Sequence, residues 1–203
     1  MPMFLLLLTA DPDTGPIEAE RAFARAAQAR GQWTAFREFM TDDAIMFFPE
    51  PTKAKTSLPE KNPPIAVQWW PAASYVACDG TAAVNTGPWV RPKASGYFTT
   101  IWLKQADGGW KWSLDHGDGL EKPRPLPERP KIRQASCRFQ RSANPHFATM
   151  TDWAGPTKGK SSDGTLLWEW TVGKDGARTF DAWLWNGRSL DRVIHDEVAA
   201  PAK

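Results

Sequence analysis

The sequence has no marked excess of charge and no long apolar run. Its 25 Lys and Arg residues nearly balance 23 Asp and Glu residues, which gives a formal net charge of +2. A balanced chain has no general attraction for nucleic acid or for an anionic membrane surface. No apolar stretch approaches the roughly 20 residues of a membrane-spanning helix. We therefore expect neither nucleic acid nor a membrane as a partner.

Metal and cofactor motifs are also missing. The three histidines and two cysteines are widely separated, and none has the spacing of a metal-ligand pair. Neither a Gly-rich phosphate loop nor a Gly-x-Ser-x-Gly nucleophile motif occurs. The sequence therefore predicts no metal site and no cofactor. Cys78 and Cys137 form one disulfide if the protein is exported, or stay as two thiols, and both alternatives are open.

The first ten residues, MPMFLLLLTA, are similar to the apolar part of a secretory signal peptide, although no Lys or Arg precedes the apolar run. We interpret residues 1–16 as a truncated signal peptide and leader. This interpretation predicts an exported or periplasmic protein. The alternative is a short apolar terminus that packs on the domain of a cytoplasmic protein.

Residues 17–119 have the pattern of a mixed helix and strand domain. An Ala-rich segment at residues 17–30, between a proline and a glycine, predicts a helix. Apolar residues at helical spacing over residues 33–40 predict a second helix, which we expect to pack on a sheet. We expect this second helix to end at the Asp-Asp pair of residues 42–43.

Strand patterns follow the two predicted helices. The apolar run at residues 44–48 ends at a proline and predicts a short strand. Residues 52–64 predict a loop, and residues 65–70 predict one helical turn. Further strands are predicted at residues 74–78, 81–90, 96–105 and 110–116. Helices followed by a curled antiparallel meander predict an α+β fold, in which the helices cross one face of the sheet and enclose a cavity.

A Pro-rich segment divides the chain into two parts. Residues 120–131 carry four prolines and charges of both signs, which is typical of a semi-rigid connector. Basic residues near this connector have almost no aromatic neighbours, so they indicate a solvated segment rather than a nucleic-acid site. Residues 132–203 form a β-rich extension with strands predicted at 165–172, 179–185 and 190–195.

The order of three segments resembles a known superfamily. The segments are GQWTAFREFMTDDAIMFFPEP, TGPWV and GYFTTIWLKQADGGWKWSLDHGD, all within residues 17–119. They are similar to the nuclear transport factor 2-like superfamily, in particular to the small bacterial SnoaL-like and ketosteroid-isomerase-like domains of the DUF4440 type. The resemblance implies a cone of curved sheet wrapped by helices, with a pocket open at one end, often in a homodimer. Such domains include isomerases, dehydratases, cyclases and binding modules, so the fold does not define the chemistry.

One position departs from the steroid isomerases of this superfamily. In those enzymes, the strand after the Asp-Asp pair carries a catalytic carboxylate immediately before a proline, and the equivalent residue here is Phe48. A phenyl ring accepts no proton. We therefore expect no steroid-isomerase chemistry by the usual base, and we interpret Phe48 as a ligand-binding residue.

The stretch WKWSLDHGDG, residues 110–119, contains the leading site candidates. Strand alternation puts His116 on the same face as Trp112, and Asp115 on the opposite face. We expect the tryptophan face to look into the cone, with His116 at the rim as a general base or hydrogen-bond donor. Asp118 then orients the imidazole or caps the turn. The alternative for His116 is a hydrogen bond to a neighbouring backbone or carboxylate group.

The neighbouring strands supply the other candidates. Residues 96–105 have an ambiguous inward face, which carries either the phenol of Tyr97 or the hydroxyl of Thr100. An inward Arg91 favours an anionic ligand group, and the alternative is a surface ion pair. The predicted catalytic residues are His116, Asp118 and Tyr97. The predicted ligand-binding residues are Phe48, Trp89, Arg91, Thr100, Trp102 and Trp112.

Three functions are compatible with the sequence. The leading one is binding of a small apolar or aromatic molecule, because 12 tryptophans supply large flat contact surfaces. The second is a cofactor-independent isomerase, dehydratase or cyclase that uses His116 in proton transfer. The third is a homo-oligomeric assembly module, in which the Trp-rich C-terminal segment packs on another chain.

Overall fold

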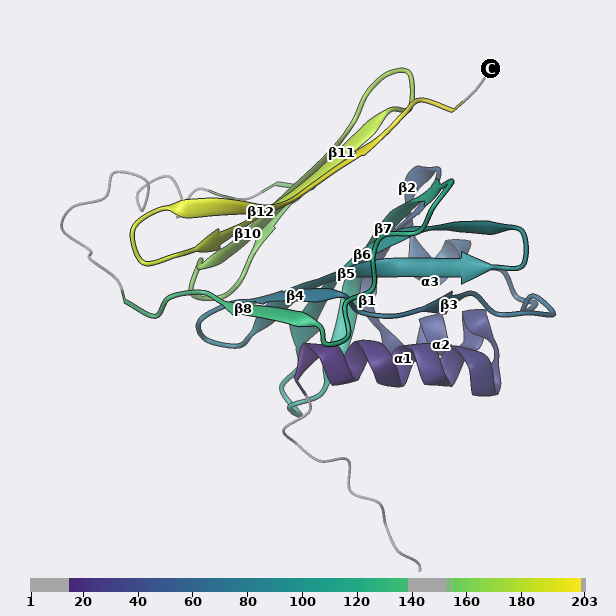
Figure 1. The fold of residues 1–203 in the computed structure, drawn as a ribbon, viewed down its shortest axis with the longest axis horizontal. Helices are drawn as coiled ribbons and strands as arrows, with labels where there is room; N and C mark the ends of the chain where they lie inside the picture. Colours follow the sequence, from purple (N-terminus) through teal and green to yellow (C-terminus); the bar gives the residue numbers. More distant parts are fainter. Residues whose placement is uncertain (1–14, 139–152, 154, 202–203) are drawn as a thin grey trace, which may run out of the picture.

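The computed structural model describes residues 15–138, 153 and 155–201, which form a helical layer, a large sheet and a small sheet. Figure 1 shows the two long helices below the large sheet and the small, yellow-green sheet above it. The fold is α+β, as predicted. Apart from its last two residues, the predicted leader at residues 1–16 lies outside the described residues.

The helical layer consists of α1 (Pro16–Arg30) and α2 (Gln32–Phe39). Pro16 suits the first turn of α1, and Gly31 follows its end with a φ of 99°, which favours glycine. The chain is already extended at Met40, so the prediction that α2 ends at residues 42–43 is wrong. None of the described helices has the length and apolar character needed to cross a membrane.

The large sheet has the strand order β2-β1-β7-β6-β5-β4-β8, and β3 pairs with β5. Its strands are β1 (Met40–Phe48), β2 (Glu50–Lys53), β3 (Gln68–Trp69), β4 (Ala73–Val76), β5 (Ala82–Arg91), β6 (Ala94–Lys104), β7 (Trp110–Leu120) and β8 (Lys131–Gln134). Pairing is antiparallel except between β1 and β7 and between β4 and β8. The helical turn predicted at residues 65–70 is wrong, because residues 68–69 form β3. Residues 52–64, predicted as a loop, include the end of β2 and the short helix α3 (Ala54–Ser57).

The small sheet has the order β12-β11-β10-β9. Its strands are β9 (Lys158–Lys160), β10 (Leu166–Val172), β11 (Arg178–Trp185) and β12 (Leu190–Val198), so the three strands predicted at residues 165–195 are confirmed. A disulfide joins Cys78, after β4, to Cys137, after β8, which resolves the two alternatives for these cysteines. Next to it, the backbone N–H of Ser136 donates to the carbonyl of Trp185 in β11.

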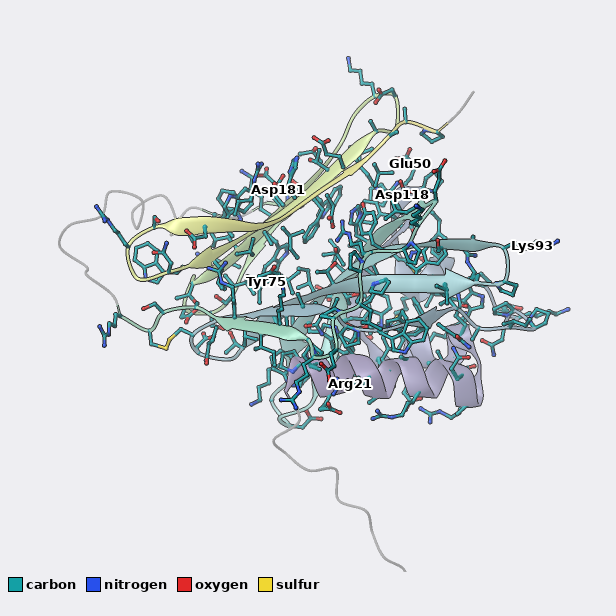
Figure 2. The ribbon with its side chains drawn as sticks, viewed as in Figure 1. Arg21, Glu50, Tyr75, Lys93, Asp118 and Asp181 are labelled. Atoms are coloured by element: carbon teal, nitrogen blue, oxygen red, sulfur yellow. A yellow bond between two sulfur atoms is a disulfide. The ribbon has the colours of Figure 1, made fainter. Side chains whose placement is uncertain are left out.

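Both faces of the large sheet are buried. The inner face packs on the helices around Phe23, and that core includes Trp102 and Trp112. The outer face packs on the small sheet, and that core includes Ile101 and Leu114. Figure 2 shows side chains filling the spaces on both sides of the sheet. Apolar residues therefore occur at odd and even strand positions, as in sheets that are covered on both faces.

Candidate functional site

A β-bulge at Ser113 determines which side chains of β7 point to each face of the large sheet. Trp112 lies opposite Trp102 of β6, whereas Leu114 lies opposite Ile101, the residue next to Trp102. Ser113 is therefore one extra residue on β7 with no partner of its own. Directly opposite residues in an antiparallel pair share a face, so the alternation of β7 is inverted beyond the bulge.

The inversion changes which polar residues face the helices. Asp115 lies opposite Thr100, two residues from Trp102, and so shares the inner face. His116 lies opposite Thr99 on the outer face. The predicted faces of His116 and Asp115 are therefore wrong, although both residues line the pocket described below. Alternation assumes a regular ladder, and the bulge breaks the ladder just before these two residues.

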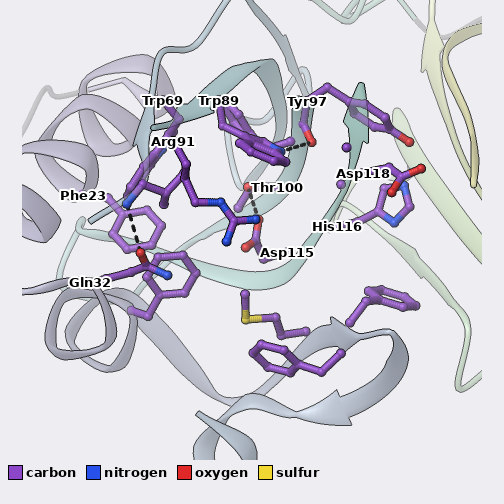
Figure 3. A pocket seen from close by; sticks show the side chains of 18 of the residues that line it. Phe23, Gln32, Trp69, Trp89, Arg91, Tyr97, Thr100, Asp115, His116 and Asp118 are labelled. Carbon is purple, nitrogen blue, oxygen red and sulfur yellow. Dashed lines mark hydrogen bonds between the residues drawn. The ribbon is translucent and has the colours of Figure 1, made fainter. Parts of the chain in front are cut away.

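A pocket of about 440 Å³ lies between the inner face and the helices. Its wall is largely aromatic and includes Trp33, Phe36, Phe47, Trp69, Trp89 and Phe98. The polar side chains of the wall include Glu20, Gln32, Arg91, Thr100 and Asp115. Figure 3 shows Thr100 and Asp115 joined by a hydrogen bond in the middle of this wall. An aromatic wall with few polar groups is typical of a small-molecule site.

Asp115 is one of three carboxyl groups that line this pocket, together with Glu20 and Asp118. The hydroxyl of Thr100 donates to Oδ1 of Asp115 at 2.9 Å. Burial raises the pKa of Asp115 to about 7, against the Thr100 hydrogen bond, and the nearby Glu20 raises it further. No partner of Oδ2 is found among the described residues, and Asp115 forms part of the wall. The pocket thus holds one carboxylate oxygen that is available to a ligand.

Glu20 is a second carboxyl group in the wall, contributed by α1. The indole N–H groups of Trp69 and Trp102 donate to it at 2.8 and 2.6 Å, and the amide of Asn85 donates at 3.2 Å. Burial raises the pKa of Glu20 to about 7 despite these three bonds. Sequence reasoning missed this residue. The available signal was its position three residues before Phe23, on the apolar face of the helix.

The three residues predicted as catalytic meet on the outer face. Tyr97 lies opposite Asp118 across β6 and β7, and the rings of Tyr97 and His116 are 6.0 Å apart. Figure 3 shows the Tyr97 ring, Asp118 and His116 together, away from Asp115. The ladder between β1 and β7 ends at Met46 and Asp115. Beyond that pair the pocket wall reaches the end of β7, so Tyr97, His116 and Asp118 of the outer face also line the pocket.

His116 is buried between the two sheets. Its Nδ1 accepts a hydrogen bond from Nε of Arg178 at 3.4 Å, and its ring stacks on Phe180. Burial, followed by the charges of Arg178 and Arg124, lowers the pKa of His116 to about 3. Although Nε2 lies 3.8 Å from the carboxylate of Asp196, burial and the two arginines keep the ring neutral. This environment is unsuited to a general base near pH 7, and the hydrogen-bond partner is an arginine rather than the backbone or carboxylate group of the predicted alternative.

A buried polar cluster surrounds His116. Arg124, from the connector, pairs with Asp196 of β12 and donates to the hydroxyl of Thr86 at 2.9 Å. The same guanidinium lies 3.7 Å above the ring of Tyr97. Burial raises the pKa of Tyr97 far above its usual value, and its hydroxyl has no hydrogen-bond partner among the described residues. The cluster joins the connector and the small sheet to the outer face.

The remaining predicted residues divide between the wall and the core. Phe48, Trp89 and Arg91 line the pocket, and the Arg91 guanidinium lies 4.8 Å above the Trp89 ring. Trp102 and Trp112 are fully buried in the core behind the wall. Of the two other histidines, residue 195 contacts carboxylates of the small sheet, and residue 146 lies outside the described residues. Within the described ranges, no three His, Cys, Asp or Glu side chains are grouped as metal ligands.

No protein-family model and no curated protein sequence matches this chain. One similar solved structure is a Novosphingobium aromaticivorans protein described as a "putative aromatic ring hydroxylase", at 14% identity and a TM-score of 0.39. It covers 52% of this chain and 87% of its own. Another is a nuclear transport factor 2-like superfamily protein from Salmonella enterica serovar Typhimurium, at 15% identity and a TM-score of 0.38. It covers 56% of this chain and 93% of its own, and its superfamily is the one that the sequence motifs resemble.

Proposed function

We propose that the pocket binds one small molecule with an apolar or aromatic body. The observation that carries this proposal is the cavity of about 440 Å³, with an aromatic wall and the Thr100–Asp115 pair within it. Burying an aromatic ring against such a wall is favourable, and one hydrogen-bonding pair orients the molecule.

The assembly alternative has less support. It requires the Trp-rich C-terminal segment to pack on another chain, whereas Trp168 and Trp185 are buried in the core shared with the large sheet of the same chain. The outer face of the cone is covered in the same way, by Phe180 and Leu184 of β11. These side chains are therefore not available for packing on another chain.

Ligand-observed nuclear magnetic resonance with 2-phenylethanol tests the binding proposal. This neutral probe has an aromatic body and one hydroxyl, so it matches the wall and Asp115. Met46→Trp fills the cavity from its wall, and we expect a loss of affinity of about tenfold or more. Ile132→Trp adds the same side chain at an exposed site on β8 and serves as the matched control. Equal binding by the two variants, or no binding by the unaltered protein, would contradict the proposal.

One observation favours a second candidate, proton transfer by Asp115. Its pKa of about 7 and its open Oδ2 suit a general base or acid, a role for which the buried His116 is unsuited. Exchange of the acidic C–H protons of 2-tetralone for deuterium tests this role. We expect the protein to accelerate exchange, with a rate that rises as pH passes through about 7 and that Asp115→Asn abolishes. An unchanged rate in that variant would assign the exchange to another group.

A further inference from the structure

Three carboxyl groups line the pocket, and two of them, Glu20 and Asp115, have only neutral hydrogen-bond partners. Glu20 accepts hydrogen bonds from two tryptophans and Asn85, and Asp115 accepts one from Thr100. Among the described residues, no Lys, Arg or His nitrogen lies within 4.0 Å of a carboxyl oxygen of either group, so neither group forms a salt bridge. Neither of these two carboxyl groups is therefore paired with a cation among the described residues, although Arg91 lines the same pocket.

A buried hydrogen-bond acceptor without a donor, the side-chain oxygen of Asn85, lies behind the pocket wall. Asn85 is fully buried, and its amide nitrogen donates to Glu20 and to the carbonyl of Pro16. Its Oδ1 has no hydrogen-bond partner among the described residues. A buried acceptor without a donor is unfavourable, so this side of the pocket lacks donors as well as positive charge.

We propose that the ligand is a protonated primary amine on an apolar or aromatic body, with its ammonium group bound to Asp115. This inference rests on the binding function proposed above, and it names the chemical class of the ligand. The ammonium group supplies a hydrogen-bond donor to Oδ2 of Asp115 and places a positive charge beside this carboxyl group. The ring of the ligand then packs on the aromatic side chains of the pocket.

The carboxyl groups of the pocket wall favour an amine over an anion as the ligand. Burial raises the pKa of both Glu20 and Asp115 to about 7, and the charge of Glu20 adds to the effect on Asp115. A cation beside Asp115 favours the ionised form of each carboxyl group, because opposite charges lower a carboxyl pKa. A carboxylate ligand would instead add a further negative charge to the same wall.

The aromatic wall also favours a cation. Ring faces attract positive charge when the cation lies within about 6 Å of the ring centre. Arg91 makes a cation-π contact of this kind in the pocket wall, with its guanidinium 4.8 Å above the Trp89 ring. Arg91 is exposed at the rim, so solvent screens its charge, and it forms no ion pair with Asp115 among the described residues.

Three probes that share a phenyl ring and a short chain test the amine. They are 2-phenylethylamine, 2-phenylethanol and 3-phenylpropanoate, titrated into the unaltered protein by calorimetry at a pH above both carboxyl pKa values. We expect the amine to bind about tenfold or more tightly than the alcohol, and the acid to bind most weakly. This comparison requires no variant, so it stays informative if a substitution unfolds the protein.

The Asp115→Asn variant tests whether Asp115 causes the preference for the amine over the alcohol. The change keeps the shape of the side chain and removes its charge, and we expect the amine and alcohol affinities to differ by about threefold or less. Asp43→Asn is the matched control, because it makes the same change at an exposed residue of β1 that does not line the pocket. We expect that variant to keep the preference for the amine.

The outcomes separate this inference from the binding function. Equal affinities for amine and alcohol in the unaltered protein would overturn the amine and leave the binding function in place. A preference that Asp43→Asn removes and Asp115→Asn keeps would also overturn it. If none of the three probes binds, both proposals fail.

Discussion

Glu20 is a single carboxyl group that the fold buries without a cation beside it. Three N–H groups stabilise its ionised form, two from indoles and one from Asn85. Desolvation outweighs them, so the pKa rises from its ordinary value of 4.5 to about 7. The folded protein therefore holds this proton more tightly than the unfolded chain does.

We expect Glu20 to make folding stability fall as pH rises from about 4.5 to about 7. A raised folded-state pKa gives stability that is complete below the unfolded pKa and is lost as pH rises through the folded pKa. The shift in the pKa of Glu20 corresponds to about 3 kcal/mol at full effect. Glu20→Gln should remove the contribution of Glu20 to the pH dependence of the free energy of unfolding. Asp115 should still contribute to that pH dependence in the same pH range.

Urea denaturation over a series of pH values measures this slope. Glu18→Gln is the control, because this residue belongs to the same turn of α1 and its side chain is 45% exposed. The expectation is a flatter profile for Glu20→Gln and an unchanged profile for Glu18→Gln. If Glu20→Gln has the same slope as the unaltered protein, the buried carboxyl group is not the source.

At the scale of elements, the bulge in β7 decides which carboxyl group faces the pocket. Deletion of Ser113 makes the ladder with β6 regular and turns Asp115 toward the apolar core between the sheets. A carboxylate buried there without a partner is strongly unfavourable, so we expect a loss of about 3–5 kcal/mol in the free energy of unfolding. Chemical denaturation followed by tryptophan fluorescence measures it. Ser113→Ala keeps the extra residue and should cost less than about 1 kcal/mol; a deletion that is equally mild would contradict the role of the bulge.

The same element shows what local patterns predict and what they do not. Helix spacing and turn residues predicted α1, most of α2 and all the long strands, because these signals are local. The faces of β7 were predicted correctly as far as Trp112. Beyond it, Leu114 suits the inner face as well as the outer face, since both are buried, and no residue type marks the bulge. The bonds from Trp69 and Trp102 to Glu20 join residues 49 and 82 positions apart, which no local pattern reports.

Two Asp-Gly-Thr turns, at residues 79–81 and 163–165, connect the sheets by reciprocal hydrogen bonds. The backbone N–H of Asp79 donates to Asp163, and that of Asp163 donates to Asp79, both at 2.9 Å. Within each turn the Asp Oδ1 also accepts from the N–H and hydroxyl of its own threonine. The repeated triplet is visible in the sequence, but its docking is not.

We expect these two aspartates to be energetically coupled. Asp79→Ala and Asp163→Ala should each lower the free energy of unfolding by about 1–3 kcal/mol, because each leaves backbone N–H groups without acceptors. The double variant should lose less than the sum, by about 0.5–3 kcal/mol, since either change breaks the same contact. A double-mutant cycle by chemical denaturation measures the coupling. Strict additivity would show that the turns stabilise the fold independently.

At the scale of the whole molecule, the C-terminal segment completes the fold of the first part. The small sheet covers Val84 and Ile101 on the outer face, and Asp196 of β12 pairs with Arg124 of the connector. The disulfide lies beside this junction, because Cys78 also donates its backbone N–H to Thr165, next to β10. Three of the strands that line the pocket, β5 to β7, lie within the loop that the disulfide closes.

Removal of the disulfide should therefore destabilise the molecule without altering the pocket. Its cysteines are 59 residues apart, and a loop of that length predicts a loss of about 4 kcal/mol in Cys78→Ser/Cys137→Ser. Thermal unfolding measures the loss. A reducing agent should lower the Tm of the unaltered protein similarly and leave that of the double variant unchanged. Because neither cysteine lines the pocket, binding of 2-phenylethanol below the Tm should be the same in both proteins; a weaker complex in the folded double variant would show that the disulfide also shapes the wall.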